Sequence, residues 1–513
     1  MEHEAFTIVT IVKEEEINPI SNFKRKGKSL ASDASSSLIQ EDGEIPVPSS
    51  STLSSLSQDE HQVPAPTEIQ SQEEPEQDEA ALRNSVTLIE RRLQEKRQAV
   101  MTRGKGRNSS VCIFRFPPRL GEINPNASQP ELVSIGPYHR GKDHLLEFED
   151  HKWLFLEKFL SRSSASGRGL RHYLSRLRKE EVDIINCYSD VIQMSSDDFV
   201  EMILLDGCFI IELLIHLNQG RDIIDDDDPI FTRPWLIPIL IRDLLKLDNQ
   251  LHFFVLDFLY QTSGIGNDME QKLGPLPILA LRTFDQASPR PMGNPNQFFR
   301  YKGEHLLHLV YSSLVCSILA THCDQLDEYC PSDQSIQCVT QLRPSGVKFK
   351  STKRDSFLDI NFKNQVLEIP SITVNDFTST LLINCVALKQ CQEKRSKYFT
   401  EYVSFMSCLI SQPRDVALLC SDGIVTRFSK DDRYVVDLFT NLGKNTDFNI
   451  RDSYLSKQFR EVESYYSSNW ATIRRTYFSS PWSFISLSSA ILLLVLTMTQ
   501  TVTSVLTFKC QLG

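Results

Sequence analysis

The sequence predicts a mainly α-helical protein, with a multi-helix globular body, a small β-hairpin element and one C-terminal transmembrane helix. Three observations lead to this prediction. Apolar residues recur at helical spacing through most of the body, as in EMILLDGCFIIELLIHL, Glu201–Leu217. One short stretch within residues 345–375 alternates with a period of two instead. The 33 residues between Arg475 and Lys509 hold no Asp, Glu, Lys or Arg, whereas a bilayer core needs about 20 apolar residues in a helix.

Residues 1–80 are predicted to form a disordered acidic tail. They are rich in Ser, Gln, Glu and Pro and hold 17 acidic and 5 basic side chains, a net charge of −12. Such a segment buries too little apolar surface to offset its conformational entropy. Because the whole chain has a net charge of −11, residues 81–513 carry about +1. A near-neutral body offers no basic surface for nucleic acid.

The body is expected at residues 81–478. An amphipathic helix at Leu82–Met101 opens it, with Val86, Ile89 and Leu93 on one face. Glu201–Leu217 is apolar nearly all round, which indicates a central buried helix. Ser411-Gln412-Pro413 marks a helix stop and restart. Further helices are predicted at Arg242–Tyr260, Glu304–His322, Leu381–Cys391 and Tyr402–Ile410.

Two later stretches have distinct periods. A small β-hairpin is predicted from two apolar runs. Leu358, Ile360 and Phe362 alternate with polar residues, and Val366, Leu367 and Ile369 follow after a short polar break. The last soluble helix is expected at Asp452–Phe478 and is about 40 Å long. Apolar residues spaced four or three positions apart form a heptad-like seam along this helix. They are Leu455, Phe459, Val462, Tyr466, Trp470, Ile473 and Tyr477. Its aromatic character favours packing on the body over self-association with a second chain.

The transmembrane helix is predicted at Pro481–Phe508, within a segment of residues 479–508 that leaves a short tail at 509–513. Arg474 and Arg475 precede it and only Lys509 follows, so the positive-inside rule favours a cytoplasmic body. The acidic N-terminus has no secretory signal pattern. The anchor suits the plasma membrane and an endomembrane equally. In the opposite orientation, glycosylation acceptors would be Asn108-Ser109-Ser110 and Asn126-Ala127-Ser128.

Several segments, in order, resemble the plant DUF247 family, also called UPF0481. They are VCIFRFPPRLGEINPNASQPELVSIGPYHRGKDHLLEFEDHKWLFLEKFL, LLDGCFIIELL, DLLKLDNQLHFFVLDFLY, GVKFK, FLDINFKNQVLEIP, DVALLCSDGIV and SPWSFISL. The resemblance runs from about residue 85 to the C-terminus. It implies a single-pass membrane protein with a mostly helical body and no established activity. Some members are linked to pollen-side recognition in grass self-incompatibility, which implies a recognition role. Relatives usually have Asn-Gly where this chain has Asn364-Gln365, which weakens a tight turn.

The strongest pattern for chemistry is GPYHRGKD. Gly136–Lys142 satisfies the phosphate-loop pattern G-x-x-x-x-G-K and lies between a strand-like and a helical segment. The following position needs Ser or Thr to hold magnesium, but it is Asp143. Pro137 removes one backbone N–H that would bind phosphate. The alternative interpretation of these residues is a turn packed against the body.

Other titratable groups have structural interpretations that we prefer. Asp206 and Glu212 on the central helix are expected to be capped or ion-paired, because a buried carboxylate needs a partner. The acidic loop Ile223–Phe231 lacks the ligand spacing of a calcium loop. One histidine-rich cluster matches no closed zinc set; it comprises His139, His144, His151, Glu147, Glu149 and Asp150.

Histidines and cysteines farther along the chain give no stronger signal. His305 and His308 lie on one helical face without a glutamate motif. The 12 cysteines contain no CxxC pair, and in a reducing compartment we expect buried free thiols. That expectation includes the regularly spaced set Cys316, Cys323, Cys330 and Cys338.

The sequence therefore favours a single-pass membrane-anchored protein of unknown biochemical activity, acting in protein interaction or in recognition and signalling. No catalytic residue, cofactor, metal ligand set or nucleic-acid partner is predicted, and we do not expect an enzyme. The expected partners are the lipid bilayer, through Pro481–Phe508, and an unidentified protein; self-association through Asp452–Phe478 is the further option. The alternative is a hydrolase or nucleotide-dependent enzyme centred on Gly136–Asp150.

Overall fold

The structure is a computed structural model of the 513-residue chain. It describes residues 83–94, 111–164, 167–219, 228, 230–263, 273–287, 303–319, 336–354, 356–392, 397–428, 431–446, 448–450, 453–478 and 481–511. The predicted tail at residues 1–80 lies outside these ranges. By its internal contacts the chain divides into two units, Thr10–Lys105 and a larger one that contains Gly106–Gly513.

In the smaller unit, residues 83–94 form a helix. This helix coincides with the first part of the predicted Leu82–Met101 helix, whose later residues lie outside the described ranges. Val86, Ile89 and Leu93 are 46%, 56% and 53% exposed. The three residues of the predicted apolar face are therefore exposed.

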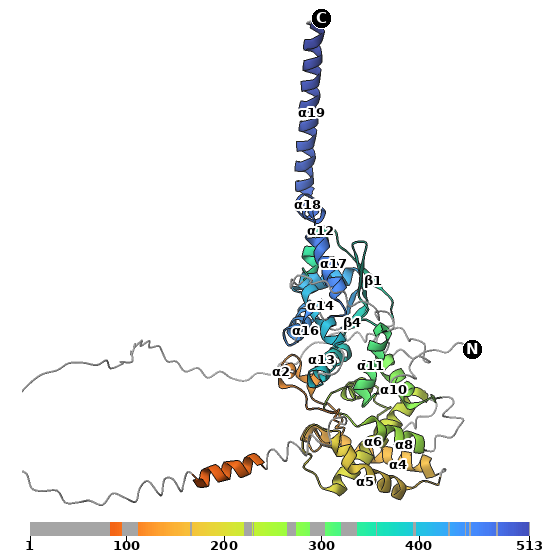
Figure 1. Cartoon of the computed structure of the whole chain (residues 1–513). Coiled ribbons are helices and arrows are strands. Elements are labelled where there is room, and N and C mark those ends of the chain that lie inside the picture. Colours follow the sequence, from red (N-terminus) through yellow and green to blue (C-terminus); the bar gives the residue numbers. More distant parts are fainter. Residues whose placement is uncertain are drawn as a thin grey trace, which may run out of the picture. The chain divides into compact units, whose positions relative to one another are not determined.

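The larger unit is mainly helical, as predicted (Figure 1). Its helices are α2 (Pro118–Gly121), α3 (Pro125–Ser128), the 3-10 helix η2 (Asp143–Leu145), α4 (Leu146–Ser164), α5 (Leu170–Asn186), α6 (Ser196–Gln219), α7 (Leu236–Asp243), α8 (Phe253–Thr262), α10 (Leu276–Ala287), α11 (Leu306–Leu319), α12 (Val339–Ser345), α13 (Asp376–Cys391), α14 (Tyr398–Leu409), α15 (Pro413–Ser421), α16 (Asp432–Lys444), α17 (Ser456–Tyr466), α18 (Asn469–Tyr477) and α19 (Pro481–Gln511).

Helix α6 is the central helix of the first half of the body, which confirms the prediction at Glu201–Leu217. Every residue from Phe199 to His216 except Glu201 is buried. Helices α4, α5, α8 and α10 pack around α6, and the first three lie beside it in Figure 1. Gly207 allows the approach of α8, because a Cβ atom there would lie 2.4 Å from Leu259 Cδ1.

Helix α13 has the same role in the second half. Its residues from Phe377 to Leu388 are all buried, and it contacts α3, α7, α11, α14 and α16. Asn384, at the centre of α13, donates to Ala127 O at 2.8 Å and accepts the Leu247 amide at 2.9 Å. These two bonds join α13 to the first half of the body, and the buried apolar residues of both halves form one core.

The predicted hairpin is present. Strands β2 (Asn361–Lys363) and β3 (Val366–Pro370) pair antiparallel across Asn364 and Gln365. The sequence pattern did not reveal the other strands. In the same sheet β1 (Lys348–Thr352) pairs parallel with β3, while β4 (Ile372–Val374) and β5 (Val425–Arg427) form a separate parallel two-stranded sheet. Parallel partners are distant in sequence, so local periodicity carries no signal for them.

Two helices predicted as continuous are broken. Arg242–Tyr260 was wrong as a single helix, because α7 ends at Asp243 and α8 begins at Phe253. The single helix predicted at Asp452–Phe478 was also wrong, because α17 ends at Tyr466 and α18 begins at Asn469. Ser468 caps α18, and its Oγ accepts the Ala471 amide at 3.3 Å. A serine that caps a new helix competes with the continuous helical backbone. The predicted restart at Pro413 is confirmed as the start of α15.

Helix α19 follows α18 at the C-terminal end of the body. Its stretch Trp482–Phe508 has 27 residues and a mean hydropathy of 1.8, and none of the apolar window is buried. A helix of this length spans about 40 Å, against a hydrocarbon core of about 30 Å. One C-terminal helix is therefore long and apolar enough to cross a membrane.

The hairpin turn generates a first prediction. Asn364 and Gln365 both have left-handed backbones, with φ of 51° and 65°. A left-handed residue with a Cβ costs roughly 1–2 kcal/mol. We expect Gln365→Gly to be more stable than Gln365→Ala by about 1 kcal/mol, measured by denaturant unfolding of the full chain in detergent.

The matched control lies in the same hairpin. Lys363 is exposed on β2, outside the left-handed region. At that position Ala is expected to be more stable than Gly, because glycine weakens a strand. Equal stability of the two Gln365 variants would contradict the prediction.

Candidate functional site

The segment that carries the phosphate-loop pattern is held by side chains from other parts of the body. Asp243, at the end of α7, accepts the amides of Glu131, Leu132 and Val133 at 2.8–3.1 Å. Asn249 accepts the Ile135 amide at 2.7 Å and donates to Val133 O at 3.1 Å. The segment therefore has a fixed path despite its lack of regular secondary structure.

Gly136 follows in a left-handed conformation, with φ of 72°. Its amide donates to Asp206 Oδ2 at 2.7 Å. A Cβ atom on Gly136 would lie 2.8 Å from Gln250 O and 3.0 Å from the Tyr188 hydroxyl. Both the backbone conformation and the lack of space therefore require glycine at this position.

A buried ion network lies beside this turn. Lys152 of α4 is completely buried, and its Nζ donates to Asp206 Oδ1, Glu149 Oε1 and Ser134 O, each at 2.6 Å. Burial raises the pKa of Asp206, while the Lys152 ammonium counteracts this effect. All three donors of the lysine are used, so the network satisfies its charges internally.

This geometry shows where the phosphate-loop residues lie. The Gly136 amide, which the pattern assigns to a phosphate, already binds the carboxylate of Asp206. Lys142 is half-buried and Asp143 is exposed, whereas the lysine that reaches the buried carboxylate is Lys152. Glu212 lies farther along α6 and pairs with Arg162 at 2.8 Å. The predicted ion pairing of Asp206 and Glu212 is therefore confirmed.

The histidine-rich cluster is dispersed. His139 is buried, with Nε2 2.9 Å from Asp248 Oδ1. His144 lies 3.2 Å from Pro130 O, and His151 stacks on Phe148. Glu149 joins the Lys152 network, while Glu147 and Asp150 are exposed. Among the described residues these side chains do not gather around one point.

Only part of the acidic loop at Ile223–Phe231 is described. Asp228 pairs with Lys158 at 2.6 Å and accepts the amides of Ile230 and Phe231 at 2.9 and 3.2 Å. Burial alone would raise the pKa of Asp228, but Lys158 and these amides together lower it. This aspartate therefore orders the segment before α7.

The side chains of the other histidines and cysteines considered in the sequence lie near the starts of helices or outside the described residues. His305 is buried, and its Nδ1 accepts the His308 amide at 3.3 Å at the start of α11. His308 Nδ1 in turn accepts the Glu304 amide at 3.1 Å. Cys338 is a half-buried thiol that precedes α12. Cys323, Cys330 and the side chain of Cys316 lie outside the described residues.

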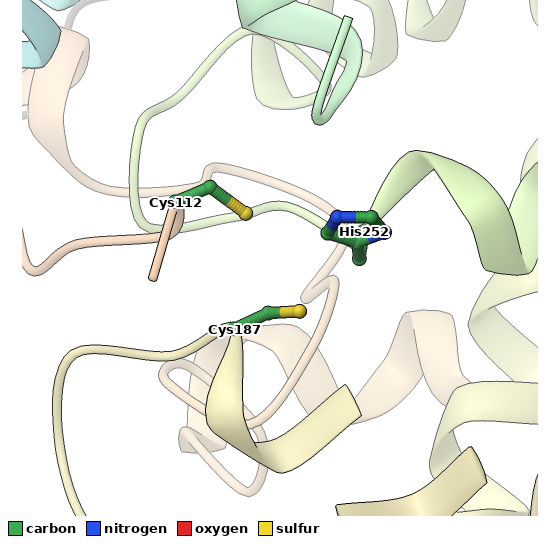
Figure 2. A group of neighbouring side chains, drawn as sticks. All are labelled: Cys112, Cys187 and His252. Carbon is green, nitrogen blue, oxygen red and sulfur yellow. The ribbon is translucent and has the colours of Figure 1, made fainter. Parts of the chain in front are cut away.

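One group of potential metal ligands was not anticipated from the sequence. Cys112, Cys187 and His252 point toward one another (Figure 2), and their ligand atoms all lie within 4.8 Å of one another. Cys112 and Cys187 are 1% and 4% exposed, neither is in a disulfide, and His252 is half-buried. The three residues come from the first described segment of the body, the end of α5 and the residue before α8.

Backbone contacts hold this group in place. The amides of Cys112 and Ile113 both donate to Cys187 O at 3.0 Å, and the Ser189 amide donates to Ile113 O at 2.9 Å. Tyr188, next to Cys187, donates its hydroxyl to Gln250 O at 3.1 Å. All three segments are thus fixed around the thiols and the imidazole.

The group also changes the acidity of a thiol. A hydrogen bond from Cys112 lowers the pKa of Cys187 to about 6; burial opposes this effect and His252 adds to it. The shift favours the thiolate, which is the form of cysteine that binds metals. No local sequence pattern indicated this group, since the three residues lie in three separate segments.

The described residues define a mainly helical protein with internally paired polar groups and one C-terminal helix able to span a membrane. A family model described as a plant protein of unknown function, DUF247, matches residues 113–496. The chain belongs to this family.

Two curated plant proteins are similar to the chain. The UPF0481 protein At3g47200 of Arabidopsis thaliana is 32% identical over 423 residues, which cover 78% of this chain and 87% of the relative. The putative UPF0481 protein At3g02645 of the same plant is 22% identical over 478 residues, covering 75% and 89%. The comparison with solved structures found no match.

The buried network generates a second prediction. Lys152→Met leaves the carboxylates of Asp206 and Glu149 without their shared cation. We expect a loss of about 3–5 kcal/mol in the free energy of unfolding, measured by denaturant titration of the full chain in detergent. Lys142→Met is the matched control and should leave this free energy within about 0.5 kcal/mol. A larger loss for Lys142→Met than for Lys152→Met would contradict this assignment.

Proposed function

We propose that this chain is a membrane-anchored protein-interaction component, with a role in recognition or signalling, rather than an enzyme. The observation that carries the proposal is α19, whose apolar stretch Trp482–Phe508 is not buried by the body. An isolated helix of this kind is stable in a bilayer, where its backbone hydrogen bonds are all internal. The lipid bilayer is therefore its natural environment.

The flanking charges support a cytoplasmic body. Arg474 and Arg475 lie at the end of α18, before the apolar stretch, and Lys509 follows it. Arg475 donates to Tyr466 O at 2.8 Å and lies 4.4 Å from the centre of the Tyr466 ring. One arginine is thus fixed next to the anchor, on the side where the positive-inside rule expects cations.

The polar groups of the body support an interaction role over catalysis. The Gly136 amide, Lys152 and Asp206 bind one another, and His139 is buried beside Asp248. The first three groups are used in contacts with one another, whereas a catalytic group must reach its substrate. The proposed activity is therefore binding by the outer surface of the body.

The proposed binding surface for a second copy of the chain is on α18. Trp470, Ile473 and Tyr477 are 60%, 43% and 46% exposed. Their spacing places them on one helical face, while Ala471 faces the body and is buried. Because α18 lies only a few residues before α19 in the chain, two anchored copies would both present this stripe close to the membrane. Leu455, Phe459 and Val462, the earlier part of the predicted seam, are buried in the body and take no part.

The anchor and its orientation are tested together in sealed microsomal vesicles. We expect protease added outside to digest the body and no sugar to be attached at Asn126, which is exposed. Arg substitutions at Leu494 and Leu496 should release the chain into alkaline carbonate, since each costs about 2.5–3.5 kcal/mol at the centre of a membrane helix. Val182→Arg, at a residue 69% exposed on α5, is the control and should stay in the membrane fraction.

Protection of the body together with a sugar at Asn126 would overturn the orientation. Release of the unmodified chain by carbonate would overturn the anchor itself.

Self-association is tested with two differently tagged full chains expressed together and extracted in mild detergent. We expect Ile473→Asp to reduce co-precipitation about tenfold, because one buried apolar side chain contributes about 1.5–3 kcal/mol. Val182→Asp is the matched control on another exposed helical face. If the unmodified chains do not co-precipitate, or if Ile473→Asp has no effect, the stripe meets the membrane surface or another protein instead.

A further inference from the structure

We propose that Cys112, Cys187 and His252 form a zinc site. Their ligand atoms lie within 4.8 Å of one another, and the three side chains converge in Figure 2. In a tetrahedral zinc site, Zn–S bonds of about 2.3 Å and Zn–N bonds of about 2.0–2.1 Å place the ligand atoms roughly 3.5–3.8 Å apart. Side-chain adjustments of about 1 Å therefore suffice to close the site.

The donor set favours zinc over other common cations. Two sulfurs and one imidazole nitrogen suit a borderline-soft ion, whereas calcium and magnesium require oxygen ligands. Both cysteines are almost completely buried. Because the three ligands come from separate segments, an ion would join the N-terminal segment of the body to α5 and α8.

The backbone prearranges the two sulfurs. The amides of Cys112 and Ile113 converge on Cys187 O, and the bond from Tyr188 to Gln250 O links the segment of Cys187 to that of His252. A prearranged site loses less conformational entropy when it binds an ion. Binding to the native state alone also stabilises that state.

Binding has defined consequences for protons. Cys187 Sγ donates to Asp183 O at 3.2 Å, and each thiol that becomes a ligand releases its proton to solvent. His252 Nδ1 accepts the Phe254 amide at 3.2 Å. A ring that binds zinc through Nδ1 loses this contact directly. A ring that binds through Nε2 must carry its proton on Nδ1, which also ends the contact. Zinc therefore competes with the N-terminal cap of α8.

Three protein ligands leave a fourth coordination position. Zinc sites with three protein ligands complete their tetrahedron with water. His252 is the most exposed of the three residues, so solvent reaches the site from its side. The proposed site thus consists of two thiolates, one imidazole and one water molecule.

The experiment is a metal titration of the full chain, purified in detergent with reductant and stripped of metal. Cobalt(II) alone is the first probe, because it reports thiolate ligation by charge-transfer absorption and tetrahedral geometry by its visible bands. We expect one Co²⁺ per chain, displaced by one Zn²⁺. Cys187→Ser should weaken zinc affinity by at least about 100-fold and reduce the thiolate absorption.

Two further variants separate loss of a ligand from loss of folding. His252→Asn keeps a side-chain acceptor for the Phe254 amide, since Asn is a good N-cap, but removes the imidazole; it should fold and bind zinc weakly. Cys420→Ser, at a half-buried thiol of α15, should bind like the unmodified chain. Three results would each overturn the proposal: no stoichiometric thiolate-bound cobalt, equal affinity in all variants, or a Cys112–Cys187 disulfide in place of bound zinc in chain purified without reductant.

Discussion

The first half of the body depends on the interactions of the Asp206 carboxylate with Lys152 and with the Gly136 amide. This carboxylate lies in the middle of α6, fully buried, and each of its oxygens has one strong donor: Lys152 of α4 at 2.6 Å and the Gly136 amide at 2.7 Å. A buried carboxylate costs several kcal/mol unless it is paired. Apolar packing alone would tolerate several positions of α4 on α6, whereas the ion pair permits one. The same carboxylate fixes the turn at Gly136, which in turn leaves no room for a side chain.

Periodicity predicted the parts of the fold in which burial decides the structure. The all-apolar pattern predicted α6, the uncharged run predicted α19, and the alternating run predicted the hairpin. The errors lie where polar side chains end a helix that the apolar pattern would continue. Between α7 and α8, Asn249 donates to Asp243 O and Gln250 donates to Leu244 O, at 3.0 and 2.7 Å. These bonds satisfy carbonyls that a continuous helix would have used. Residue patterns do not reveal which competing bond is formed.

Sequence patterns were also a poor guide to the candidate sites: they pointed to one segment held by internal contacts and missed one group of potential ligands. GPYHRGKD places several chemically versatile residues in one short segment, so the sequence directed attention there. In the structure the Gly136 amide binds Asp206 and His139 lies beside Asp248, whereas Lys142 is half-buried and Asp143 is exposed. Cys112, Cys187 and His252 are individually unremarkable in the sequence and lie in three separate segments. The two cysteines lie side by side because a short backbone bridge joins their neighbours Ile113 and Tyr188. Tertiary contacts, not spacing, define this group.

In the proposed membrane-anchored state, the orientation of α19 would determine the chemistry of that group. On the cytosolic side, a reducing compartment keeps Cys112 and Cys187 reduced, and a reduced cysteine can lose its proton to become the thiolate that ligates zinc. On the opposite side the same two sulfurs, within 4.8 Å of each other, would meet oxidising conditions, and the backbone bridge that holds them together would favour a disulfide. His252 would then have no ion to bind and would keep its cap on the Phe254 amide. In that proposal the charges beside α19 and the thiols of the body are linked, because the side of the membrane that the arginines favour would also set whether the two cysteines are thiols or a disulfide.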